Sequence, residues 1–290
     1  MKLLAKFNLI LLVLFGTGLA LVSHYAYRFL TANARSQVLQ QAELMIESAR
    51  STRDYTNEEL KPLLQKVADE HTFVRQTVPA YAATVTFDRL RKNYPDYSYK
   101  EAALNPTNPR DRAVEWEADI INYFRNHLDQ KTVIGDRDTP TGRSLYLAHP
   151  IPAPPPCLGC HSTPEKAPPS VIETYGTNNG FGWNPGEIVA AQIVSVPMTV
   201  PVQIADKAFK VLLIYLVAIF VITLIAIDAA LVTIVIRPVR QLANRAERIS
   251  QGEMDMPELQ ARSSDEIGDV TRSFNRMYLS LSKALKMLQE

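Results

Sequence analysis

Two cysteines and a histidine form the cluster in this sequence whose residue types and spacing predict a specific chemistry. They lie in the segment Pro156-Cys157-Leu158-Gly159-Cys160-His161, and the chain contains no other cysteine. Two thiols separated by two residues can reach the two vinyl groups on one edge of a porphyrin, and a histidine directly after the second thiol can ligate the iron. The motif therefore predicts one covalently attached haem c, with thioethers at Cys157 and Cys160 and with His161 as the proximal ligand.

Other uses of paired cysteines compete with this interpretation. A dithiol redox pair has the same spacing, but it is expected beside a βαβ pattern, which the sequence does not show. A structural zinc site needs four ligands, so these three residues would require a distant fourth. A chance match of a short motif is the remaining alternative. Haem attachment is favoured because it uses both cysteines of the chain and the histidine that follows them.

The second axial position of a haem iron can be filled by Met, His, Cys, Tyr or water. Both cysteines are used by the thioethers, so Met45 is the first candidate, because it lies on the apolar face of a helix expected directly after the first membrane span. Ordinary core packing is the alternative role for this methionine. His71 and Met198 are the other candidate ligands, and an open position holding water would suit a gas sensor. The remaining histidines are expected to be interfacial, solvated or structural: His24, His127 and His149.

Two apolar stretches organise the chain around this motif. Phe7–Tyr27 is about the length that a bilayer requires at 1.5 Å rise per residue, and Val211–Ile236 is also long enough to span. A signal peptide cleaved after Ala20 is the competing interpretation of the first stretch. We expect a retained transmembrane helix, because Tyr25 and Tyr27 would lie at the membrane interface, where such rings are favoured.

Positive charges predict the orientation of both spans. Lys2 and Lys6 precede the first stretch, and Arg237 and Arg240 follow the second. Because such charges concentrate on the cytoplasmic side, we expect a two-pass protein of the cytoplasmic (inner) membrane with residues 29–208 on the periplasmic side. Asp228 within the second stretch is costly in lipid, which favours either a contact between helices or a position near the cytoplasmic headgroups.

The outer segment has helical patterns first and strand patterns second. Helices are expected over 31–68, Pro79–Arg91 and Asp111–Asn126, and strands over Ser144–Ile151 and Glu187–Met198. Between the two strands lies a loop with eight prolines from Pro150 to Pro169, and this loop carries the cysteines. This order predicts an α+β fold in which helices pack on a small sheet.

The residues after the second span show two apolar seams with steps of three and four residues. The seams consist of Val235, Val239, Leu242, Ala246 and Ile249, and of Ile267, Val270, Phe274, Met277, Leu281, Ala284 and Leu288. Such spacing is typical of coiled coils. Each seam alone is short for a stable coil, so we expect both helices of two chains to form a parallel four-helix bundle, that is, a homodimer.

Specific motifs extend these expectations to known families. Arg237-Pro238, Gly252-Glu253-Met254 and Asp265-Glu266-Ile267-Gly268 resemble a HAMP domain, the dimeric relay module of bacterial transmembrane receptors. Three outer segments resemble periplasmic c-type haem sensor domains with a PAS-like fold, which precede HAMP modules in chemoreceptors and sensor kinases. These segments are LRKNYPDYSYKEAALNPTNPRDRAVEWEADIINYFR, TPTGRSLYLAHPI and CLGCHSTPEKAPPSVIETYGTNNGFGWNPGEIVAAQIVSVPM. The resemblance implies a sheet-and-helix haem pocket with His161 proximal and a distal ligand that varies between members. Members of this family tend to carry Arg where this chain has His149.

Together these features predict four regions: 1–28 (cytoplasmic start and first span), 29–208 (periplasmic haem domain), 209–236 (second span) and 237–290 (HAMP domain). We expect a haem-based sensor, not an enzyme, that detects redox state or a gas and signals to a separate cytoplasmic protein. A membrane-anchored cytochrome acting in electron transfer is the main alternative, and a haem peroxidase is a weaker one. With 31 basic and 30 acidic residues the composition gives no reason to expect a nucleic-acid partner.

Overall fold

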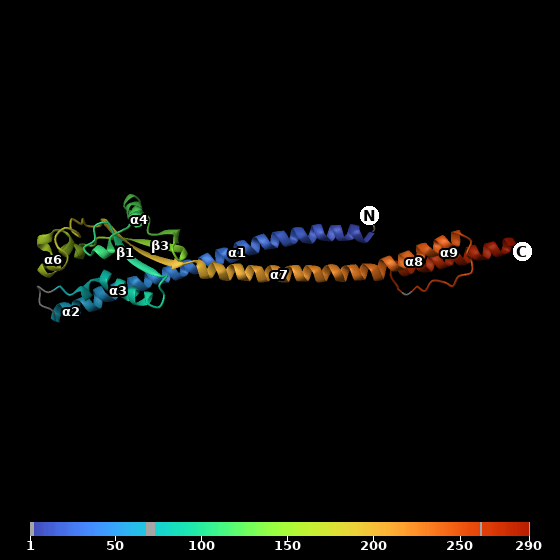
Figure 1. The fold of residues 1–290 in the computed structure, drawn as a ribbon, viewed down its shortest axis with the longest axis horizontal. Coiled ribbons are helices and arrows are strands. Elements are labelled where there is room, and N and C mark those ends of the chain that lie inside the picture. The colour runs from blue at the N-terminus through green and yellow to red at the C-terminus, as the bar shows by residue number, and fades with distance from the viewer. Residues whose placement is uncertain (1–2, 68–72, 262, 290) are drawn as a thin grey trace. The chain divides into compact units, whose positions relative to one another are not determined.

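The computed structural model describes residues 3–67, 73–261 and 263–289. Figure 1 shows the chain as a ribbon. By its internal contacts the chain divides into two compact units, Tyr27–Phe209 on the one hand and Met1–Ala26 with Lys210–Glu290 on the other. We refer to the first as the sensor unit, after the family that its sequence resembles, and to the second as the membrane unit, after its two long apolar stretches.

The sensor unit is built on a four-stranded antiparallel sheet. Its strands are β1 (Ser98–Ala103), β2 (Val133–Thr139), β3 (Gly142–Pro152) and β4 (Ile188–Pro197), in the spatial order β1-β4-β3-β2. The sheet and its helices confirm the α+β fold class expected from the sequence. β3 and β4 match the two expected strands, whereas β1 and β2 had no counterpart among the expected strands.

Helices cover both faces of this sheet, because side chains on a strand alternate between the two faces. The carboxyl-terminal half of α1 (Leu3–Tyr55) and α3 (Pro79–Arg91) pack on one face, and α4 (Glu115–Asn126) packs on the other. The first face buries Val38, Ala42, Ile46, Ala49, Ala83, Phe87, Tyr99, Leu145, Leu147, Val194, Val196 and Met198. The second face buries Ala102, Ile120, Ile121, Phe124, Ala148, Ala191 and Ile193.

Short elements complete the sensor unit. After α1 come a π-helical segment, Thr56–Leu60, and α2 (Lys61–Val67). Pro62 at the start of α2 has no N–H and its ring crowds the preceding turn, which accounts for a widened turn at this place. The other short elements are 3₁₀ turns at Arg75–Thr77, Pro109–Asp111, Pro155–Cys157 and Pro164–Lys166, with α5 (Leu158–His161) and α6 (Pro169–Tyr175).

The membrane unit contains the start of α1 together with α7 (Thr199–Ala230), a π-helical segment (Leu231–Ile236), α8 (Arg237–Ser250) and α9 (Glu266–Gln289). The helical runs Leu4–Val67 and Thr199–Ser250 each contain a stretch that is long and apolar enough to cross a membrane, judged by length and composition. The two stretches touch through the rings of Phe15 and Phe220, whose centroids lie 5.4 Å apart. They also share a hydrogen bond of 3.1 Å from Asn8 Nδ2 to Asp228 Oδ2. Asp228 therefore makes a contact between helices, one of the two roles expected from the sequence.

The connector between α8 and α9 is held on α9 by two polar side chains. The Tyr278 hydroxyl donates to the carbonyl oxygen of Met254 at 2.6 Å, and Asn275 exchanges two hydrogen bonds with the backbone of Leu259, at 2.8 and 3.2 Å. Asp265 caps α9 by accepting from the Gly268 N–H at 3.1 Å. A Cβ at Gly268 would lie 1.9 Å from the carbonyl oxygen of Ser263, so this position requires glycine.

Candidate functional site

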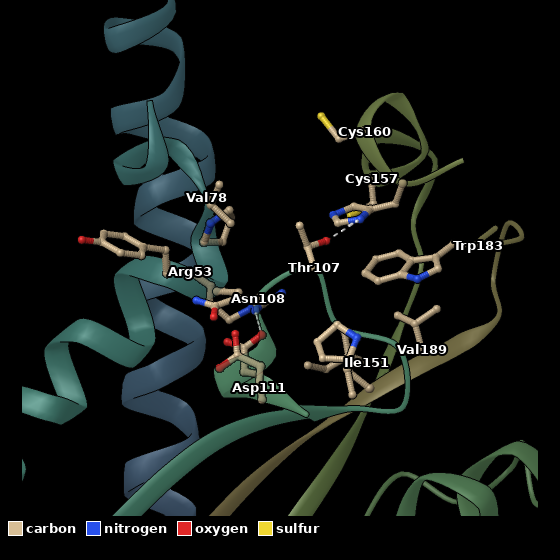
Figure 2. A pocket seen from close by; sticks show the side chains of 18 of the residues that line it. Arg53, Val78, Thr107, Asn108, Asp111, Ile151, Cys157, Cys160, Trp183 and Val189 are labelled. Atoms are coloured by element: carbon tan, nitrogen blue, oxygen red, sulfur yellow. Dashed lines mark hydrogen bonds and ion pairs between the residues drawn. The ribbon is translucent and has the colours of Figure 1, made fainter. Parts of the chain in front are cut away.

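A cavity of about 520 Å³ opens in the sensor unit, and Cys157, Cys160 and His161 all line it (Figure 2). Its volume lies within the range of about 300–1,000 Å³ that is usual for cofactor and ligand pockets. The three residues of the sequence motif therefore share one cavity. The sequence alone placed them only in a loop.

Local helical turns determine how these three side chains are presented. Pro155–Cys157 forms a 3₁₀ turn that continues directly into α5 (Leu158–His161). Cys157 and Cys160 are three residues apart in this turn, so they share one side of it. Both thiols are free, and both cysteines are half-buried. Prolines before the motif favour such a short, stiff connection over a strand.

The imidazole of His161 is fixed by three neighbours. Its Nδ1 lies 2.7 Å from the carbonyl oxygen of Gly180, which can only accept, so Nδ1 carries the proton and Nε2 is left with its lone pair. The Trp183 indole stacks on the ring with centroids 3.9 Å apart and planes 10° from parallel. The Thr107 hydroxyl lies 3.4 Å from Nδ1. A hydrogen-bonded second nitrogen is the usual orientation device of a metal-ligating histidine.

The loop that supplies the Gly180 carbonyl is braced on both sides. Gly182 N–H donates to the carbonyl oxygen of Ser162 at 2.9 Å, and Trp183 N–H donates to that of His161 at 3.2 Å. Gly180 has φ +86°, and a Cβ there would lie 2.0 Å from Thr107 Oγ1. Glycine is required at this position both by its conformation and by the close approach of Thr107.

Burial sets the protonation states of the three motif residues. It raises the pKa of the Cys157 and Cys160 thiols, and for both the partly opposing influence of basic neighbours is smaller. Burial lowers the pKa of His161, against the opposing effect of its bond to the Gly180 carbonyl. The imidazole is thus kept neutral, which is the form that binds a metal.

The rest of the cavity wall has an apolar part and a polar part. Ala103, Val189 and Ala190 line the apolar part and are buried in one cluster with Ala153, against which Ile151 and Trp183 pack. The polar part includes the ion pair of Arg53, from α1, with Glu101, from β1. In Figure 2, Arg53 and Trp183 lie on opposite sides of the space. An apolar enclosure with a few charged groups at its edge is suited to a large, flat and mostly apolar cofactor.

The donor set of this cavity fits a covalently bound haem. Two thiols and one neutral imidazole with a free Nε2 lone pair are the groups that such attachment requires. In the part of the chain that the structure describes, no group of three His, Cys, Asp or Glu side chains is arranged to hold a metal ion by itself.

The structure places the other candidate ligands elsewhere. Met45 is partly buried against the core between α1 and the sheet, and Met198 is buried in that same core. Neither lines the cavity. His71 lies outside the described residues. His149 does not line the cavity either; its Nε2 lies 3.3 Å from the Thr132 hydroxyl.

Several residues of the site were not anticipated from the sequence motif: the cavity-lining Arg53, Glu101, Thr107 and Trp183, and Gly180, whose carbonyl bonds to His161. Gly180 and Trp183 lie in the Asn- and Gly-rich segment Asn178-Asn179-Gly180-Phe181-Gly182-Trp183. Such a segment is a turn signal, and it could have marked these two residues as part of a close backbone approach. Arg53 and Glu101 carry no such signal, because they lie in a long helix and a strand that only the tertiary fold brings together.

Comparisons with known proteins relate the chain to two families. The profile of the Tll0287-like family (Tll0287) matches residues 31–197, and that of the HAMP domain matches residues 230–283. A search of curated protein sequences found no match. The crystal structure of the cyanobacterial haem protein Tll0287 is similar with 16% sequence identity and a TM-score of 0.44, and the match covers 55% of this chain and 94% of that one. The family expected from the sequence is confirmed: the chain belongs to the Tll0287-like family, with a HAMP domain after its sensor unit.

Proposed function

We propose that this protein is a membrane-bound haem c sensor whose periplasmic domain passes a signal through the HAMP domain to a cytoplasmic partner. The observation that carries the proposal is the convergence of Cys157, Cys160 and His161 on one cavity of the sensor unit. This unit belongs to the Tll0287-like family, lies between two membrane-spanning candidates and is followed in the chain by a HAMP domain. A sensor role in signalling is the function that this order of domains supports.

The residues of the chain have separate tasks in this proposal. Cys157 and Cys160 hold one haem by thioether bonds, and His161 presents Nε2 to the iron. Gly180 and Trp183 hold the imidazole in place, through a hydrogen bond and a ring stack. A bound haem would supply a one-electron couple and an axial position for a small ligand.

A bound haem would have a sixth coordination position that water or a gas can occupy. Met45 and Met198 lie in the core and not at the cavity, so no methionine sulfur is found in the described part of the lining, and His71 lies outside the described residues. Tyr81 and Tyr175 do line it and could contribute a hydroxyl near the ligand. A ferrous form that binds carbon monoxide or nitric oxide would support gas detection, whereas a spectrum indifferent to both would support redox detection.

An electron carrier is the second candidate function. The cavity by itself would suit a haem that carries electrons as well as a haem that acts as a sensor. The HAMP domain favours the sensor, because an anchored carrier needs no relay module. We do not propose an enzyme, since a peroxidase would not need this module either.

The dimer and the orientation are part of the proposal. α8 and α9 leave apolar side chains of their seams exposed, including Val239, Val270 and Met277, which a second copy of the chain would cover. Cysteine introduced at Phe274 is expected to cross-link to the same position of the other copy. Cross-linking only between opposite ends of α9 would contradict the parallel arrangement.

The orientation in the membrane is tested by proteolysis. Protease added outside spheroplasts should cut the sensor unit and spare α9, and the reverse pattern would contradict the proposed orientation.

The haem itself is tested with the purified full-length protein. A denaturing gel stained for haem should show a band at the mass of the chain, with one iron per chain by metal analysis. Cys157→Ala and Cys160→Ala should each reduce haem retention, and His161→Ala should keep the stain but alter the spectrum. Loss of the stain from the unmodified protein on denaturation would overturn the proposal.

A further inference from the structure

An ion pair between a partly buried arginine and a buried glutamate connects α1 to the wall of the cavity. Arg53, in the last turn of α1, pairs with Glu101 of β1, and both line the cavity. The exposed fraction is 24% for the Arg53 side chain and 7% for that of Glu101. Charges so far from bulk water are weakly screened, so a change of charge in the cavity acts on this pair more strongly than on surface pairs.

The pair is part of a longer hydrogen-bonded network that anchors the carboxylate. The second oxygen of Glu101 accepts from the Tyr99 hydroxyl at 2.7 Å, and Gln192 Nε2 donates to that hydroxyl at 3.1 Å. Burial and the neighbouring carboxylate raise the pKa of Tyr99 well above its ordinary value, so the hydroxyl stays a donor. Glu101 is thus held on the sheet by β1 and β4, whereas Arg53 belongs to the helix.

Stability alone does not explain such a pair. The desolvation of two buried charges often cancels their attraction, and apolar residues of similar size do as well or better. Elsewhere on the same helix, an ion pair of Arg35 with Asp136 of β2 links α1 to the sheet without lining the cavity. The distinguishing property of Arg53 and Glu101 is therefore their position at the cavity.

We propose that Arg53 and Glu101 form the electrostatic contact through which the charge of the bound cofactor acts on α1. This inference rests on the proposed haem function. A more positive cavity repels Arg53 and attracts Glu101, and a less positive one reverses both effects. Because Glu101 is tied to the sheet and α1 runs as one helix from Leu3 to Tyr55, the resulting force falls on the helix that contains the first membrane-spanning candidate.

Reciprocity makes this proposal testable on the cofactor itself: if the charge of the cofactor acts on Arg53, then Arg53 must act on the reduction potential. The couple is one electron added to ferric iron by a chemical one-electron reductant, with no bond or proton exchanged by either side chain. Removing the positive charge in Arg53→Gln should lower the potential, and removing the negative charge in Glu101→Gln should raise it. Arg53→Lys keeps the charge and should restore most of the potential of the unmodified protein.

The matched control is the ion pair of Arg35 with Asp136, which also links α1 to the sheet. Arg35→Gln and Asp136→Asn change the same kinds of charge away from the cavity and should leave the potential unchanged. Shifts of the reduction potential that have equal sign in Arg53→Gln and Glu101→Gln, or that are no larger than in the controls, would overturn the proposal.

Haem staining separates this inference from the proposed haem function, so each variant is first stained for haem on a denaturing gel. A stained protein without the opposite shifts contradicts only this inference, whereas an unstained unmodified protein contradicts the haem function itself.

The effect on α1 is measured separately with two nitroxide labels in the sensor unit. Leu44 on α1 and Tyr123 on α4 are both exposed and can be replaced by labelled cysteine, since both native cysteines are used by the thioethers. Reduction should change the distance between the labels in the otherwise unmodified protein and leave it unchanged after Arg53→Gln. An equal change in both proteins, or none in either, would show that the pair does not act on α1.

Discussion

The imidazole of His161 and the indole of Trp183 lie face to face, with centroids 3.9 Å apart and an angle of 10° between their planes. Trp183 also donates its backbone N–H to the carbonyl oxygen of His161, so the two residues are joined through both backbone and side chain. One face of the proposed iron ligand is thereby covered, and its rotation is restricted.

Trp183→Leu should therefore alter the absorption and electron paramagnetic resonance spectra of the haem without releasing it. The stack holds the ring orientation, whereas the thioethers at Cys157 and Cys160 do not depend on it. Trp116 is the other tryptophan of the chain and packs on Tyr146 with ring centroids 5.4 Å apart, away from the cavity. Trp116→Leu is the control, and it should lower the thermal midpoint and keep the spectra. Equal spectral changes in both variants would contradict an orienting role for Trp183.

Gly180→Ala should also disturb the His161 imidazole, through the hydrogen bond between its Nδ1 and the Gly180 carbonyl oxygen. The added Cβ would lie 2.0 Å from Thr107 Oγ1, and φ at this position is +86°. We expect a loss of about 1–3 kcal/mol in the free energy of unfolding, together with a changed spectrum. Gly159→Ala is the matched control, because nothing lies within 4 Å of a Cβ there. A Gly180→Ala protein with native stability and spectrum would show that this close approach is not required.

Met45→Ala should leave the ferrous spectrum and the reduction potential unchanged. The side chain packs against the core between α1 and the sheet and does not line the cavity. Truncating a partly buried methionine should lower the free energy of unfolding by about 1–2 kcal/mol. A changed potential in this variant would restore Met45 as a candidate ligand.

Asp228→Leu should loosen the contact between the two membrane-spanning candidates, because it leaves Asn8 without its partner. The reporter is a disulfide between cysteines introduced at Phe15 and Phe220, whose rings touch in the native protein. Cross-linking should become less efficient in Asp228→Leu and recover partly in the double variant Asn8→Leu with Asp228→Leu. Thr233→Val is the control, since the Thr233 hydroxyl bonds only within its own helical run. Unchanged cross-linking in Asp228→Leu would argue against the contact.

His149 should make the sensor unit less stable in mild acid. Burial, assisted by Arg50, lowers the pKa of this imidazole in the folded protein below its ordinary value. The unfolded chain then binds more protons as the pH falls through about 6.5, so stability decreases from that pH downward to the lower pKa of the folded state. Urea midpoints at pH 7.5 and 5.5 should differ less in His149→Gln than in the unmodified protein. An equal difference in both proteins would assign the acid sensitivity to other groups.

The expected strands show where local pattern is sufficient. β3 and β4 form the interior of the sheet; partial alternation of apolar residues predicts β3, and a segment rich in β-branched residues predicts β4. β1 and β2 are edge strands rich in charged residues, such as Lys100 and Glu101 or Asp136 and Arg137. They are strands because a neighbouring strand supplies hydrogen bonds, a cause that no local periodicity records.

The sequence by itself determined the attachment motif, the two membrane-spanning candidates, the α+β class and the HAMP seams. Each of these depends on residues that are close together in the chain, where spacing and hydropathy act directly. Tertiary structure alone decided which side chains surround the motif. Arg53, Glu101 and Trp183 come from a helix, a strand and a loop that are far apart in the sequence, and they meet only when α1 packs on the sheet. The tertiary structure also decided that Met45 packs against the core. An apolar helix face indicates that a side chain is buried, but not which residues it contacts.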